Sequence, residues 1–113
     1  MKKIYGIDEK LQDTINESDK KAEGGKFRFL YRAVISNHVA ESGIEAMEYV
    51  EVGLKLGVDG ADIELEDAEF NKIKNALDKN PLKWPAAMVG QLYKKLVDSE
   101  KKYEEEQKAK GGK

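Results

Sequence analysis

Apolar residues recur at helical spacing in four stretches of the chain. An α-helix brings positions i, i+3, i+4 and i+7 to one side, so this spacing predicts amphipathic helices. The predicted helices span residues 27–39, 43–57, 67–79 and 85–97. The side chains expected to face the core are Phe27, Leu30, Ala33 and Val34; Ile44, Met47, Val50 and Leu54; Phe70, Ile73 and Leu77; and Met88, Val89, Leu92 and Leu96. Each set is expected to be buried in one shared interior.

Residues that start and stop helices stand at the predicted boundaries. Ser42 can accept a hydrogen bond from an early helical N–H, and Glu45, three residues later, completes a capping box. Gly57 suits the end of that helix, since glycine is favoured just after a last helical turn. Pro85 fits the first turn of the last helix, where its missing N–H costs nothing.

The segment between the second and third helices predicts a short strand. Asp62-Ile63-Glu64-Leu65 alternates polar and apolar residues, as a half-buried strand does. Either Glu66 or Asp67 then caps the third helix, because acidic side chains suit the positive end of a helix dipole.

The first 26 residues are polar and carry few apolar side chains. Leu11 and Ile15 are spaced like one side of a short helix. Ile4 and Thr14-Ile15 are equally compatible with a short strand. The sequence leaves these two structures open.

The predicted fold is mainly α: a compact bundle of about four helices with a short β element, which can be part of a two-stranded piece. Residues 1–26 form a polar N-terminal segment and residues 27–100 form the helical core domain. Residues 101–113 contain one aromatic residue and no apolar stripe. They are therefore expected to form a flexible, charged and solvated C-terminal tail.

Composition and charge narrow the classes of partner. The chain has 113 residues, of which 37% are charged, and its formal net charge is −2. Residues 28–80 carry six basic and eleven acidic side chains, whereas residues 81–113 carry eight basic and five acidic ones. An acidic body repels phosphate backbones, which argues against DNA or RNA as the main ligand. Without cysteine, the chain can form neither disulfide bonds nor thiolate metal sites.

The start of the chain and its apolar runs bear on localisation. The first six residues have a basic opening but lack the following apolar run of a signal peptide. No uninterrupted apolar stretch approaches the ~20 residues that span a bilayer. We therefore expect a cytoplasmic protein without membrane contact.

His38 is the only histidine, so every hypothesis of histidine catalysis or zinc binding depends on it. Ser36, Glu41 and Ser42 lie near it in the sequence, but spatial geometry defines a catalytic triad. A zinc site would have only carboxylates as further ligands. His38 is therefore expected to be a surface or capping residue.

The acidic residues that follow the second helix resemble a calcium loop at first sight. If Asp59 opened the loop, Ala61 and Ile63 would occupy its third and fifth positions, where oxygen ligands are required. Catalysis by carboxylates such as Glu64 and Glu66 needs a partly buried pocket that raises one pKa. A charged helical surface explains the same residues. We expect no catalytic residues, no cofactor, no metal and no enzymatic activity.

Four residues are candidates for binding a partner. Arg28 and Arg32 stand four positions apart in a stretch of basic and aromatic residues, which is typical of surfaces for single-stranded nucleic acid. Trp84 covers the core at a turn or serves as an exposed anchor, because tryptophan is enriched at binding hot spots. A surface that includes Trp84 or Tyr93 would make a homodimer natural.

Three segments resemble a family of small proteins encoded by tailed bacteriophages and prophages. They are residues 29–37 (FLYRAVISN), 63–74 (IELEDAEFNKIK) and 84–92 (WPAAMVGQL). The family has no assigned activity, so the resemblance implies no functional residues. It implies a phage accessory or assembly protein that acts in the host cell cytoplasm. The lysine-rich tail departs from the family pattern.

The leading hypothesis is a small non-enzymatic accessory or assembly protein of phage type, which binds a phage or host protein through a helical surface. The alternative is a nucleic-acid-binding regulator that uses Arg28, Arg32 and the C-terminal lysines. The alternative predicts a steep salt dependence of binding, because nucleic acids release counterions when a protein binds them.

Overall fold

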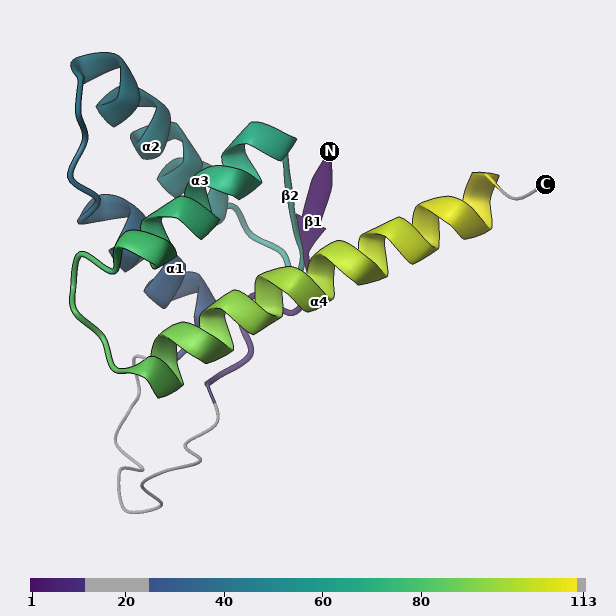
Figure 1. Ribbon diagram of the computed structural model, residues 1–113. Helices are drawn as coiled ribbons and strands as arrows, with labels where there is room; N and C mark the ends of the chain where they lie inside the picture. The colour runs from purple at the N-terminus through teal and green to yellow at the C-terminus, as the bar shows by residue number, and fades with distance from the viewer. Residues whose placement is uncertain (12–24, 112–113) are drawn as a thin grey trace.

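The computed structural model describes residues 1–11 and 25–111 (Figure 1). In chain order the elements are β1 (Lys2–Ile4), α1 (Phe27–Ser36), α2 (Gly43–Leu56), β2 (Ile63–Leu65), α3 (Asp67–Lys79) and α4 (Ala86–Gly111). The four helices and the two-stranded sheet of this part of the chain confirm the predicted fold class. The alternatives left open for Thr14 and Ile15 lie outside the described residues.

The two strands form an antiparallel pair, in which Ile4 stands opposite Ile63 and Lys2 opposite Leu65. Ile63 and Leu65 are buried and the intervening Glu64 is exposed, as the alternating sequence predicts. Ile4 has no exposed surface. The sequence leaves a short helix and a short strand open for the N-terminal segment, and the structure places Ile4 in a strand.

The N-terminal segment contributes to the core, although its polar composition predicts a segment outside it. Ile7, like Ile4, is fully buried. The Ile7 N–H donates to the Ala61 carbonyl, and the Ile7 carbonyl accepts from the Arg28 N–H, each at 2.8 Å. The described part of residues 1–26 therefore packs as part of the same body as the helices.

The helix starts confirm Ser42 and Glu66 as N-cap residues, but the capping box predicted for Ser42 and Glu45 is only half formed. At α2, the Ser42 hydroxyl oxygen accepts a hydrogen bond from the Glu45 N–H (3.1 Å). At α3, Glu66 is the N-cap residue, and its N–H donates to the Glu69 carboxylate (2.8 Å), which forms a capping box. The same helix ends at Asn80, whose left-handed backbone (φ 46°) is a common helix terminus for asparagine.

The core is built around α1, which contacts the other three helices. Tyr31 of this helix is fully buried, and its hydroxyl donates to the Leu92 carbonyl of α4 (2.7 Å). The core side chains without exposed surface are Ile4, Ile7, Tyr31, Val34, Val52, Leu56, Phe70, Ile73, Ala76, Leu92 and Leu96.

Helix α4 is longer than its apolar stripe predicts. The stripe ends near Val97, yet the helix continues to Gly111, and its C-terminal part extends away from the other helices (Figure 1). The side chains of residues 101–110 are mostly charged and exposed, which agrees with the predicted solvation of this segment. Lysine and glutamate are good helix formers, so the expected tail continues as regular helix up to Gly111.

Helix α2 buries the side opposite to the predicted one. Tyr49, Val52 and Leu56 face the core. The predicted core residues are exposed instead: Ile44 (70%), Met47 (58%), Val50 (61%) and Leu54 (66%). The prediction that all four helical stripes are buried in one interior is therefore wrong for α2, because this helix is apolar on two opposite sides.

Candidate functional site

A cluster of exposed apolar side chains lies on the outer side of α2. Of the eight large apolar residues that are exposed in the described part of the chain, five lie on α2 or directly after it. These five, which we call the α2 apolar face, are Ile44, Met47, Val50, Leu54 and Val58. Single exposed apolar residues are normal on a protein surface, whereas a patch of them marks an interaction site.

Helical geometry makes this face continuous. Met47, Val50 and Leu54 are three and four residues apart, and such positions are neighbours on a helix surface. On the opposite side, Val52 and Leu56 have no exposed surface. An apolar side of a helix is normally buried, yet no described residue covers the outer side of α2.

Contacts of the inner side fix the orientation of α2. The His38 ring stacks on Tyr49 with the ring centroids 4.0 Å apart, and His38 Nε2 lies 2.8 Å from Glu45 Oε1. The Tyr49 hydroxyl accepts a hydrogen bond from the Asn75 side chain of α3 (3.0 Å). The His38 side chain is only 5% exposed. The prediction of a surface histidine is therefore wrong, since His38 packs against the helix and holds its apolar face outward.

Charged side chains form the edge of the face that borders α3. Glu48 lies 3.9 Å from Lys72 Nζ, and Lys55 Nζ lies 2.7 Å from the Glu69 carboxylate. The hydrogen bond with Glu69 raises the pKa of Lys55, so this lysine is protonated at neutral pH. Glu51, on the same edge, is exposed. Two glutamates and one lysine of α2 therefore flank the apolar residues on this side.

Small residues form the edge of the face that borders α1. A Cβ added at Gly53 would lie 3.7 Å from the Ile35 side chain, and a Cβ at Gly57 would lie 3.3 Å from Arg32 Cζ. Ala46 occupies the same edge nearer the start of the helix. Arg32, a predicted binding residue, is exposed and lies beside Gly57 at one end of the face. Its role in binding stays a prediction.

Arg28 serves the fold, which leaves its predicted role in partner binding without support. The residue is only 9% exposed. Its Nε donates to Asp8 Oδ1 (2.8 Å), which raises the pKa of Arg28 and lowers the pKa of Asp8. Its terminal nitrogens donate, at 2.6 Å each, to the carbonyl oxygens of Leu56, Val58 and Gly60. Arg28 thus satisfies backbone groups at the C-terminal end of α2 and just beyond it.

The other two predicted binding residues lie on different elements. Trp84 is in the connection between α3 and α4, and Tyr93 is on α4. Both side chains are half-buried and pack against the core. Neither belongs to the α2 apolar face, so their roles in partner binding stay predictions.

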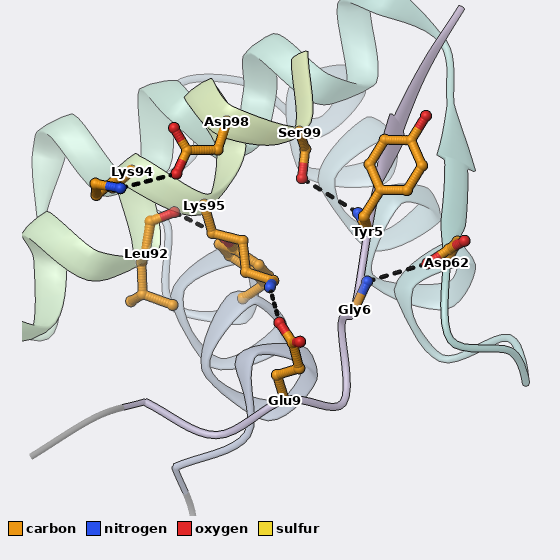
Figure 2. A network of polar contacts seen from close by, with 10 residues as sticks. Tyr5, Gly6, Glu9, Asp62, Leu92, Lys94, Lys95, Asp98 and Ser99 are labelled. Carbon is orange, nitrogen blue, oxygen red and sulfur yellow. Dashed lines mark hydrogen bonds and ion pairs between the residues drawn. The ribbon is translucent and has the colours of Figure 1, made fainter. Parts of the chain in front are cut away.

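A groove of about 970 Å³, lined by polar and apolar residues, lies between the N-terminal segment and α4. Figure 2 shows the ion pairs beside it, in which Lys95 of α4 binds Glu9 and Lys94 binds Asp98 (2.9 Å). The first of these pairs joins the N-terminal segment to α4. The Lys95–Glu9 pair therefore serves the fold, and the groove is a weaker candidate site than the α2 apolar face.

The acidic residues after β2 also have structural partners. Asp67 lies 2.9 Å from the N-terminal ammonium of Met1, and this hydrogen bond lowers the pKa of Asp67. Glu69 binds Lys55 and completes the capping box of α3. Among the described residues, no group of three or more histidine, cysteine, aspartate or glutamate side chains is arranged to hold a metal ion.

Comparisons of the chain with known protein families, with curated proteins and with solved structures gave no match. The resemblance to small phage proteins therefore rests on the three sequence segments alone. Within residues 1–11 and 25–111, no helix combines the length and the hydropathy that crossing a bilayer requires.

Proposed function

We propose that this protein is a small non-enzymatic accessory or assembly protein, which binds a protein partner through the α2 apolar face. The observation that carries this proposal is the exposure of Met47, Val50 and Leu54 on a regular helix whose inner side is packed. Covering apolar surface contributes roughly 25 cal/mol per Å². Apolar side chains at this helical spacing are a common means of recognising a partner helix or groove.

The surroundings of the face also favour a protein partner. Protein interfaces combine an apolar centre with a polar rim. Glu48, Glu51 and Lys55 supply such a rim beside Val50 and Leu54. A surface of this composition suits another folded chain better than it suits a small polar ligand.

A phage origin, with action in the host cell cytoplasm, is part of the same proposal and is supported by the three similar segments alone. The alternative of nucleic-acid binding relies on Arg28. The donors of this side chain already bind Asp8 and backbone carbonyls, so they are not free to bind a phosphate. The acidic balance of residues 28–80 also opposes it. We therefore favour a protein partner.

Site-specific photocrosslinking in the native cell tests the proposal. A crosslinking amino acid replaces Val50 on the face or, as the matched control, Gln107, an exposed residue of α4. Protein adducts, including adducts with a second copy of the chain, are expected from position 50 and are expected to be rare from position 107. No adduct with any protein from position 50, or equal adducts from both positions, would contradict the proposal.

A further inference from the structure

We propose that the partner of the α2 apolar face is a second copy of this chain, bound with the two α2 helices antiparallel in a two-fold symmetric dimer. This inference rests on the proposed function, since it names the protein that covers the same surface. Most homo-oligomers have closed symmetry, and a two-fold dimer places the same patch of both subunits in contact. The surface must then complement itself, and the charged residues along one edge of α2 allow this.

The two edges of the face distinguish the possible orientations. At 3.6 residues per turn, successive side chains are about 100° apart around a helix. Met47, Val50 and Leu54 therefore lie along the middle of the exposed side, between the edge with charged residues and the edge with small residues. The contact of Lys55 with Glu69 of α3 and the contact of Gly53 with Ile35 of α1 place these edges on opposite sides.

Two-fold symmetry decides which edges meet. In an antiparallel pair, each edge faces the same edge of the other copy, so the charged residues meet one another. In a parallel pair, the charged edge faces the small edge. The antiparallel arrangement brings lysine and glutamate together across the interface, whereas the parallel arrangement leaves Glu51 and Lys55 of α2 opposite alanine and glycine. Charge complementarity therefore favours the antiparallel dimer.

One register pairs the apolar and the charged residues at once. If Val50 lies opposite Leu54 of the second copy, the symmetry also places Leu54 opposite Val50. Met47 then lies opposite position 57, next to Val58, which is 58% exposed. Lys55 lies opposite position 49, between Glu48 and Glu51 of the second copy. The Lys55 side chain is 46% exposed beside Glu69, so it can approach a further carboxylate.

The size of the face sets the strength of the dimer. Stable interfaces bury about 800 Å² on each partner. The α2 apolar face consists of five large apolar side chains that are each more than half exposed, and apolar patches on monomers rarely exceed a few hundred Å². The dimer should therefore dissociate on dilution.

Sedimentation velocity of the full chain over a range of concentrations tests the dimer. The wild type should change from monomer to dimer as its concentration rises, and Val50→Asp should weaken dimerisation about tenfold or more, because it brings two carboxylates into an apolar contact. The control Gln107→Asp adds the same charge to an exposed position of α4 and should leave dimerisation unchanged. Circular dichroism checks that both variants fold.

A wild type that stays monomeric at every concentration would overturn the inference, and so would a dimer that Val50→Asp leaves intact. If a monomeric wild type still crosslinks to another protein from position 50, the second copy is the wrong partner and the proposed function stands. If it crosslinks to nothing, both fail.

Disulfide trapping tests the orientation, since the chain has no cysteine of its own. Chains with Val50→Cys and chains with Leu54→Cys are mixed and mildly oxidised. A disulfide needs Cα atoms roughly 4.4–6.8 Å apart, so the antiparallel register should give mainly disulfides between position 50 and position 54. A majority of disulfides joining identical positions would contradict the proposed antiparallel register.

Discussion

The two sides of α2 carry similar residues and lie in opposite environments. Val52 and Leu56 on the inner side have no exposed surface, whereas Val50 and Leu54, two residues earlier in each case, are more than half exposed. Residue type therefore does not decide which side is buried. The difference comes from contacts that only one side makes, chiefly the stacking of Tyr49 on His38 and its hydrogen bond with Asn75.

This comparison separates residues that stabilise one molecule from residues that are free to bind another. Substitutions on the inner side should lower the free energy of unfolding. Equivalent substitutions on the outer side should leave the monomer stable and change its association.

The largest effect is expected from a matched pair of leucines. Leu56→Ala should lower the free energy of unfolding by about 2–5 kcal/mol, because it leaves a cavity in the core. Leu54→Ala should change it by no more than about 0.5 kcal/mol, as is usual for exposed positions. Urea unfolding at a low protein concentration, where the monomer predominates, measures both. Equal losses for the two variants would show that α2 does not have the described orientation.

A smaller effect is expected from the arginine that binds the end of α2. Arg28→Ala leaves the carbonyls of Leu56 and Val58 without their buried donor, which should lower the free energy of unfolding by about 1–3 kcal/mol. Arg32→Ala, at an exposed position of the same helix, is the matched control and should have little effect. If Arg32→Ala lowered the free energy of unfolding more than Arg28→Ala did, the assignment of Arg28 as the arginine that stabilises the end of α2 would be contradicted.

The smallest effect is expected from the contact between His38 and Glu45 beside Tyr49. The hydrogen bond with His38 lowers the pKa of Glu45 from its usual 4.5. A carboxyl group whose pKa is lowered by folding contributes stability above its unfolded pKa, and this contribution is lost as the pH falls through the folded pKa. Between about pH 6 and pH 3, the wild type should therefore lose stability more steeply than Glu45→Gln.

Unfolding curves at several pH values measure this difference in slope. Glu104→Gln, a change at an exposed position of α4, serves as the control and should follow the wild type. If the free energy of unfolding changed equally with pH in the wild type and in Glu45→Gln, the contact between His38 and Glu45 would not stabilise the orientation of α2.

Much of the fold follows from local sequence patterns. The helical spacing predicts the helices, Ser42 predicts the start of α2, and the alternation of Ile63 and Leu65 predicts β2. Each of these signals lies within a few residues, where backbone hydrogen bonding and side-chain periodicity act directly. The assignment of Ile4 to a strand needs β2, which lies about 60 residues later in the sequence. A local pattern does not contain that information.

The candidate site was harder to predict, because α2 has two apolar stripes. Tyr49, Val52 and Leu56 follow the spacing i, i+3 and i+7, and this second stripe is the sequence signal that α2 is apolar on both sides. Which stripe faces inward depends on His38 and on residues of α3. The position of Arg28 is hard to predict for a similar reason, since Asp8 lies 20 residues before it and its carbonyl acceptors lie 28 to 32 residues after it.

The outer side of α2 is uncovered in one molecule, and in the proposed dimer a second copy covers it. The rate at which a soluble thiol reagent modifies Leu54→Cys, measured at low and at high protein concentration, tests it most directly, with Gln107→Cys as the control. Position 54 should be modified fast at low concentration and markedly more slowly at high concentration, whereas position 107 should be modified at the same rate at both. Modification of position 54 at the same rate at both concentrations would contradict the proposed dimer.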